Sequence, residues 1–192
     1  MSSTETSGAT VVVETPRLTL RHLTPADADS LAAVWSDAEA MRYFPRVLTP
    51  AEVKELIERN LQQYRKEGHG LYAVVLRASG EVIGDCGLAR QHVHGRDEIE
   101  VAYHLRPSVW GKGYATEAAG ACLYHGFRRL GLNRIVALVR PENQPACRVA
   151  EKLGMTAEKQ VLWRGIQHLV YAAAGTAWVE RAGTAGEFAN PE

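Results

Sequence analysis

The sequence predicts a single mixed α/β (α+β) domain with a mostly antiparallel central sheet flanked by helices. Segments in which apolar and polar residues alternate, the period of a half-buried strand, recur along the chain. Two pairs of apolar segments are separated by short turns and are typical of antiparallel hairpins. Only one clear strand–helix–strand unit is present, between about residues 97 and 139, which argues against a doubly wound nucleotide-binding fold.

The first half of the chain is predicted to form a strand, two helices and a hairpin. A proline at Pro25 follows the candidate N-cap Thr24, and this pair is typical of a helix start. Thr49 and Glu52 have the spacing of a capping box, and Gly68 ends the helix that they begin. In chain order the predicted elements are a strand at residues 17–23, a helix over 25–35, a helix over 50–67, and hairpin strands at 71–76 and 82–88.

The second half is predicted to form a strand, a long helix, a strand, a short helix and a final hairpin. Gly131 ends the long helix, Asn143 caps the short one, and Gly154 closes it. The predicted elements are a strand at residues 97–105, a helix from about 114 to 130, a strand at 135–139, a helix over 144–153, and hairpin strands at 155–163 and 167–171.

Length and composition agree with one domain and two short tails. The chain has 192 residues, enough for a core that needs no disulfide or structural metal. We assign residues 14–180 to the domain. Ser, Thr, Gly and Ala dominate residues 1–13 and 181–192, and we expect both segments to be disordered.

The charge balance excludes several classes of partner. Lys and Arg together number 22, as do Asp and Glu, so no net positive field attracts a nucleic acid or an anionic membrane. No apolar run is long enough to span a membrane, and the N-terminus is not that of a secretory signal. Three scattered cysteines do not form a disulfide framework, and reduced thiols fit a cytoplasmic protein. We expect a monomer or a homodimer.

A glycine-rich loop precedes the long helix. Main-chain N–H groups at a helix N-terminus, approached closely past glycines, can bind a phosphate or pyrophosphate. A plain tight turn is the alternative. A P-loop is excluded because Lys112 precedes Gly113, and an NADP-dependent oxidoreductase is disfavoured by the order of the strands. The loop residues are Gly111, Lys112, Gly113, Tyr114, Ala115 and Thr116.

Two motifs together resemble the GNAT family of acetyl-CoA-dependent N-acetyltransferases, and its RimJ/RimL-type branch in particular. The first motif is the glycine loop at residues 110–118, and the second spans residues 143–155. The opening at 14–21 and the segment 82–84 also match that branch, so the resemblance covers about residues 14–174. It implies the GNAT fold, acetyl-CoA as cosubstrate and no metal.

The resemblance also assigns binding residues. It implies that the N–H groups from Gly111 to Thr116 hold the pyrophosphate of CoA. It implies that the strand through His104 and Leu105 pairs with the pantetheine arm, and that Asn143 lies near that arm while also capping its helix.

Glu100 is our candidate for the catalytic base. Ile99, Val101, Tyr103 and Leu105 share one face of the strand, and Glu98, Glu100, Ala102 and His104 share the other. By the resemblance, a carboxylate at Glu100 is placed to take a proton from an amine. The alternative is that Glu98 and Glu100 are two solvated residues of a polar face.

The general acid stays open. The hydroxyl residues that the family often carries are replaced by Ala146 and Ala150, which leaves Tyr114, Cys147 or no acid at all. An acyl-enzyme at Cys147 is disfavoured because no His or Asp partner is evident. His92, His94 and His104 are candidates for a metal site, but a loop of this composition is more often simply solvated, and we expect the latter.

The predicted function is therefore acetyl transfer from acetyl-CoA to a primary amine by direct attack. The acceptor is a protein N-terminal α-amine or, alternatively, a small-molecule amine. A non-catalytic acyl-CoA-binding regulatory module is a further alternative, because of Ala146 and Ala150.

Overall fold

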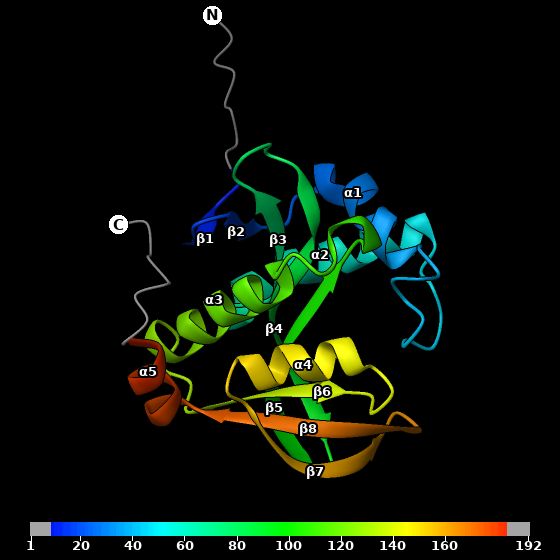
Figure 1. The fold of residues 1–192 in the computed structure, drawn as a ribbon. Helices are drawn as coiled ribbons and strands as arrows, with labels where there is room; N and C mark the ends of the chain where they lie inside the picture. Colours follow the sequence, from blue (N-terminus) through cyan, green and yellow to red (C-terminus); the bar gives the residue numbers. More distant parts are fainter. Residues whose placement is uncertain (1–8, 184–192) are drawn as a thin grey trace, which may run out of the picture.

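Residues 9–183 of the chain are described by a computed structural model. Within these residues one sheet of eight strands has the order β1-β2-β3-β4-β5-β6-β8-β7, with helices on both faces (Figure 1). Every neighbouring pair is antiparallel except β5 and β6, which are parallel. The predicted fold class is confirmed, and the predicted strand–helix–strand unit is β5–α3–β6.

The elements have the following bounds. The strands are β1 (Val11–Glu14), β2 (Leu18–His22), β3 (Leu71–Leu76), β4 (Val82–Val93), β5 (Arg96–Leu105), β6 (Arg134–Val139), β7 (Thr156–Trp163) and β8 (Ile166–Ala174). The helices are α1 (Ala28–Trp35), α2 (Pro50–Glu67), α3 (Tyr114–Arg128), α4 (Gln144–Lys152) and α5 (Gly175–Gly183), with 3-10 turns at Pro25–Asp27 and Pro107–Val109.

The ends of the domain differ from the prediction. Residues 11–13, expected to be disordered, belong to the edge strand β1, where Val13 is buried in the core. Residues 181–183 belong to α5, a helix that the sequence reading missed. β4 also continues five residues beyond the predicted end at 88, because it pairs with the whole length of β5. The remaining tail residues, 1–8 and 184–192, lie outside the described part of the chain.

The two faces of the sheet bury separate sets of side chains. Successive residues of a strand point to opposite faces, so Tyr72 and Val74 of β3 pack towards α3 while Ala73 packs towards α1 and α2. Small residues of α3, including Ala118, Ala119 and Cys122, are fully buried and bring this helix close to the sheet.

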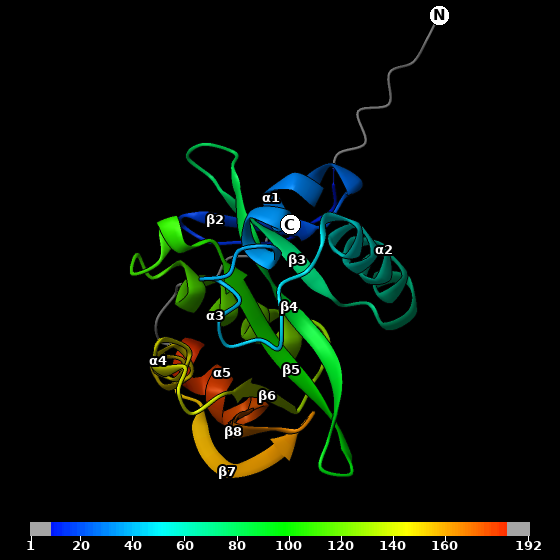
Figure 2. The same ribbon diagram turned by 90° about the vertical axis from the view of Figure 1, so that its right-hand side faces the viewer.

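The parallel strands β5 and β6 open the sheet near its centre. Among the described residues they share one register pair, Glu100 with Val136, although β6 pairs along its whole length with β8. Beyond Glu100 the two strands diverge, so that groups on this edge of β5 face a gap rather than a strand. The segment between α1 and α2 crosses in front of β4 and β5 at this place (Figure 2).

Candidate active site

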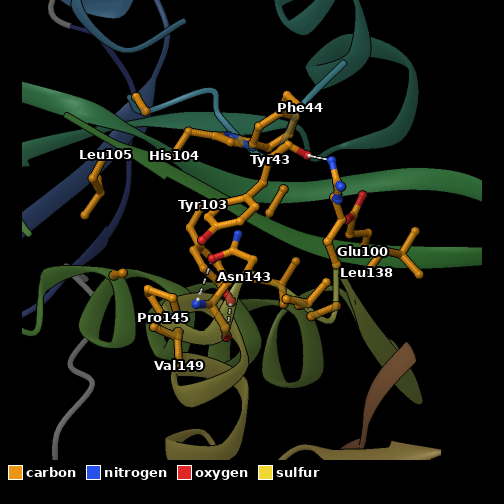
Figure 3. Close-up of a pocket in the computed structure, with 18 of the residues that line it drawn as sticks. Tyr43, Phe44, Glu100, Tyr103, His104, Leu105, Leu138, Asn143, Pro145 and Val149 are labelled. Atoms are coloured by element: carbon orange, nitrogen blue, oxygen red, sulfur yellow. Dashed lines mark hydrogen bonds between the residues drawn. The ribbon is translucent and has the colours of Figure 1, made fainter. Parts of the chain in front are cut away.

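A pocket of about 660 Å³ occupies the opening between β5 and β6. Its walls come from β5, β6, the start of α3, the start of α4, the segment after α1 and the β7–β8 hairpin (Figure 3). Nine of the ten predicted site residues line it: Glu100, His104, Leu105, Gly111, Gly113, Tyr114, Ala115, Thr116 and Asn143. The tenth, Lys112, is exposed and does not line the pocket.

The glycine loop has the backbone geometry that its glycines permit. Gly111 and Gly113 have φ values of 75° and 83°, in the left-handed region that side chains with a Cβ rarely adopt. Gly113 is the N-cap of α3, so the unpaired N–H groups of the first turn lie at the pocket wall. This arrangement, with the positive end of the helix dipole, suits an anionic ligand.

Arg17, the residue before β2, contacts this loop. The sequence analysis did not assign it a function. Its Nη1 donates to the carbonyl of Lys112 at 2.9 Å, and its Nε donates to Oε2 of Glu117 at 2.6 Å. The guanidinium also lies over the ring of Tyr114, 4.6 Å from the centroid. Because this side chain is half exposed, it adds positive charge beside the loop while holding the loop in place.

The middle of the pocket lies between β5 and α4. Asn143 accepts a hydrogen bond from the N–H of Ala146 at 3.3 Å, which confirms that it caps α4. The Tyr103 hydroxyl donates to the carbonyl of Ala146 at 3.0 Å. The indole of Trp110 donates to the carbonyl of Leu105 at 2.7 Å, so that carbonyl already has a partner.

Glu100 lies at the point where β5 and β6 separate, beside Leu138 (Figure 3). Gln91 Nε2 donates to its Oε2 at 2.9 Å. Burial in the pocket wall raises the pKa of Glu100 to about 7, although the bonds from Gln91 and from the main chain of Leu138 favour the carboxylate. A carboxyl with this pKa is able to accept and release a proton near neutral pH.

Glu98 and Glu100 share a strand face but not an environment. Arg134 Nε donates to Oε2 of Glu98 at 3.1 Å, and Glu98 does not line the pocket. The alternative of two equally solvated carboxylates therefore does not hold.

A buried carboxylate that the sequence reading missed contacts His104. Asp85 has no exposed surface, and its Oδ1 lies 2.7 Å from Nδ1 of His104. The indole N–H of Trp35 donates to its Oδ2 at 2.6 Å. No local pattern in the sequence indicates this contact. It follows from the pairing of β4 with β5, which places Asp85 directly opposite His104.

The two candidate general acids, Cys147 and Tyr114, differ in their position relative to the pocket. Cys147 is buried and does not line the pocket, which leaves an acyl-cysteine route without support. Tyr114 does line the pocket, beneath Arg17.

Positive side chains outnumber negative ones around the pocket. Among the described lining residues the acids are Glu39 and Glu100, and the Lys and Arg residues are Arg42, Arg140, Arg148, Lys152 and Arg164. Arg164 lies near the candidate base, because its Nη2 donates to Oε1 of Gln91 at 3.3 Å.

The three histidines considered for a metal site do not meet. His92 pairs with the exposed Asp97 at 2.9 Å, whereas His104 lies at the other end of the β4–β5 hairpin. No group of three or more His, Cys, Asp or Glu residues with the geometry of a metal site occurs within residues 9–183. In the same part of the chain, no helix combines the length and apolar character that a membrane crossing needs.

Comparison with known proteins gives a family match and several relatives. Residues 17–156 match the family model described as acetyltransferase (GNAT) domain. An uncharacterized N-acetyltransferase, p20 of Bacillus licheniformis, is 36% identical over 150 residues, which cover 75% of this chain and 82% of that protein. The spermidine N(1)-acetyltransferase of Escherichia coli K12 is 28% identical over 146 residues, or 74% of this chain and 75% of that protein.

A solved structure shows the same fold at low sequence identity. RimL, a ribosomal-protein alpha-N-acetyltransferase in complex with coenzyme A, has a TM-score of 0.70 and 18% identity, and the match covers 85% of this chain and 97% of that one. At this identity the likeness concerns the fold alone.

Proposed function

The chain belongs to the GNAT family of acetyltransferases, and from this we propose that it transfers the acetyl group of acetyl-CoA directly to a primary amine, with a protein N-terminal α-amine as the acceptor. One observation carries the proposal. A single pocket extends from the glycine loop at the start of α3, through the gap between β5 and β6, to the Glu100 carboxyl.

The loop end of the pocket is proposed to hold the CoA pyrophosphate. The free N–H groups between Gly111 and Thr116 supply donors without a side-chain charge. Arg17 supplies positive charge beside them. His104 and Leu105 end the strand along which the pantetheine arm is proposed to run, and Asn143 faces that arm from α4.

Glu100 is the proposed base. An amine attacks a thioester only as the neutral species, so its ammonium form must first lose a proton. The α-amine of a peptide has a pKa near 8, about one unit above that of Glu100, whereas a side-chain-type amine is nearer 10. Proton transfer to Glu100 is therefore less unfavourable from an α-amine than from a side-chain-type amine.

The charge of the pocket supports the same acceptor. A polyamine carries several positive charges and needs several carboxylates. Here Glu100 is accompanied by Arg164, and positive side chains predominate in the lining. An acceptor with a single ammonium group suits this lining better. The RimJ/RimL-like motifs favour the same choice.

A small-molecule amine is the second candidate, since a spermidine acetyltransferase is among the relatives. Thiol release from acetyl-CoA separates the candidates. The panel contains peptides that differ in their first residue, the same peptides with blocked N-termini, and spermidine with other small amines.

We expect release with free peptides and none with blocked ones. Release with small amines alone would support the second candidate. If no acceptor gave release while acetyl-CoA still bound, the protein would be a non-catalytic acyl-CoA-binding module.

A further inference from the structure

A second group with the geometry of a proton acceptor lines the same pocket as Glu100. The ring of His104 packs against the rings of Trp35 and Phe44, with centroid distances of 4.3 and 5.2 Å, and Figure 3 shows it beside Phe44. Its Nδ1 is held by Asp85 at 2.7 Å. Its Nε2 has no hydrogen-bond partner among the described residues, and the side chain borders the pocket.

We propose that His104 is a second catalytic proton acceptor, which takes a proton from the acceptor nitrogen through Nε2, and that Asp85 is the residue that positions it. This inference rests on the proposed acetyl transfer. It assigns a different proton to each of two groups on one strand face, Glu100 and His104.

The reaction has two protons to move. The ammonium nitrogen loses the first, which gives the neutral amine. Its lone pair then forms the C–N bond while the carbonyl π pair moves to oxygen. The nitrogen that has attacked must next lose a second proton as the oxygen pair returns and the C–S pair leaves on sulfur. One proton ends on the thiol and the other in water, so the products are the amide, CoA-SH and one H⁺.

Glu100 is assigned the first proton and His104 the second. The two residues flank Ala102, whose methyl group leaves the strand face between them open. Four residues of an extended strand span about 13 Å, and the two side chains are close enough for their charges to interact across the pocket.

Asp85 sets which ring nitrogen carries the proton. Its Oδ2 accepts the indole N–H of Trp35, and its Oδ1 faces Nδ1 of His104. Because a carboxylate only accepts hydrogen bonds, the proposal assigns the ring proton to Nδ1, which leaves the lone pair on Nε2. When Nε2 takes a proton, the imidazolium forms beside a negative charge.

Other charged and titratable groups surround the pair from each neighbouring element. Tyr64 of α2 interacts with Asp85, and Glu100 interacts with His104 along β5. The same pocket is lined by Glu39, Arg42 and Tyr43 from the segment after α1 and by Arg140, the residue after β6.

The test compares pH–rate profiles of His104→Gln and Glu100→Gln. The Glu100 variant should recover as pH rises, because the amine then loses its first proton to water. The His104 variant should lose about 10²-fold or more at every pH, because the second proton must leave the nitrogen whatever its starting state. Asp85→Asn should behave like His104→Gln.

His92→Gln is the matched control, since His92 also pairs with an aspartate but lies on the exposed end of the same hairpin. It should keep the wild-type profile. A His104→Gln rate within about twofold of wild type, or one that recovers with pH in parallel with Glu100→Gln, would overturn the proposal.

A second measurement needs neither a variant nor an acceptor. Nitrogen NMR of the wild-type imidazole should show the neutral His104 ring protonated at Nδ1. Protonation at Nε2 instead would also overturn the proposal. Wild-type thiol release reports separately on the acetyl transfer, so a failure of that function is distinct from a failure of the His104 assignment.

Discussion

Two glutamates on one strand face illustrate how surroundings decide chemistry at the residue scale. Glu98 is bound by Arg134, whereas Glu100 lies in the pocket wall against Gln91 and Leu138. The same side chain is thus an ion-pair partner at one position and, with a pKa of about 7, the proposed proton acceptor at the other.

Replacement of Glu100 by Gln should lower turnover at neutral pH by about 10²–10⁴-fold, because the amide keeps the shape but accepts no proton. The loss should shrink as pH rises. Acetyl-CoA affinity should change little, since the proposed contacts of CoA with β5 are made by the main chain. Steady-state rates between pH 6 and 9.5 and calorimetry check both points.

Glu98→Gln is the control on the same face and should keep the wild-type pH–rate profile. If Glu98→Gln lost activity while Glu100→Gln did not, the base would be assigned to the wrong carboxylate.

Glu100→Gln should also stabilise the folded protein at alkaline pH. The pKa of Glu100 is raised from 4.5 to about 7 in the folded state, so the folded protein holds this proton more tightly than the unfolded chain. The contribution of Glu100 to the free energy of unfolding is therefore fully present below pH 4.5 and is lost as the pH rises to about 7. One pKa unit corresponds to about 1.4 kcal/mol. Because the side chain keeps some solvent contact, we expect a gain of about 2 kcal/mol at pH 8.5.

Urea unfolding of wild type and Glu100→Gln at pH 5 and pH 8.5 measures this difference. The gain should be small at pH 5. A larger gain at pH 5 than at pH 8.5 would contradict the raised pKa.

At the element scale, the glycine loop and α3 act as one unit. Gly113 is both the last loop residue and the N-cap of the helix, so its left-handed backbone turns the first N–H groups towards the pocket. Arg17 holds the loop through Lys112 and the helix through Glu117.

Gly113→Asp should weaken acetyl-CoA binding by about 100-fold or more. The new carboxylate would face a pyrophosphate, and two like charges about 4 Å apart repel by about 4 kcal/mol at an effective dielectric constant of about 20. Isothermal calorimetry on the folded variant measures the loss.

Gly131→Asp is the matched control, because Gly131 follows the other end of α3 with φ of 66° and open space around it. It should show the same backbone strain and unchanged affinity. Equal acetyl-CoA affinities for both variants and the wild type would contradict the assignment of the glycine loop as the pyrophosphate site.

At the scale of the whole molecule, the C-terminal region completes the fold. The family match ends at residue 156, yet β8 lies between β6 and β7 and α5 follows it. Trp178 of α5 is 4% exposed, packs 5.6 Å from the ring of Phe127, and donates its indole N–H to the carbonyl of Leu153 at 2.8 Å. These contacts join α5 to α3 and to the end of α4.

Trp178→Ala should therefore lower the free energy of unfolding by about 3–5 kcal/mol, the usual cost of removing a buried aromatic ring. Leu162→Ala removes a side chain that is 64% exposed and should cost less than about 0.5 kcal/mol. Chemical denaturation compares the two. Equal, small effects would mean that α5 does not dock on the core.

Local patterns in the sequence were enough to predict the kinds and order of the central elements and the glycine loop. The capping box at Thr49 and Glu52 is present, Gly68 ends α2 with a φ of 74°, and Asn143 caps α4. These features depend on residues a few positions apart, so periodicity and capping chemistry are enough to predict them. The resemblance to the GNAT family likewise came from two local motifs and is confirmed by the family match.

The pocket, in contrast, is formed by contacts between parts of the chain that are distant in sequence. The opening between β5 and β6 depends on how strands distant in the chain pair. The contacts of Asp85 with His104 and Trp35, and of Gln91 with Glu100, join residues on separate elements. The edge strand β1 and helix α5 were missed for the same reason, since their short apolar segments are stable only against partners that local sequence does not reveal.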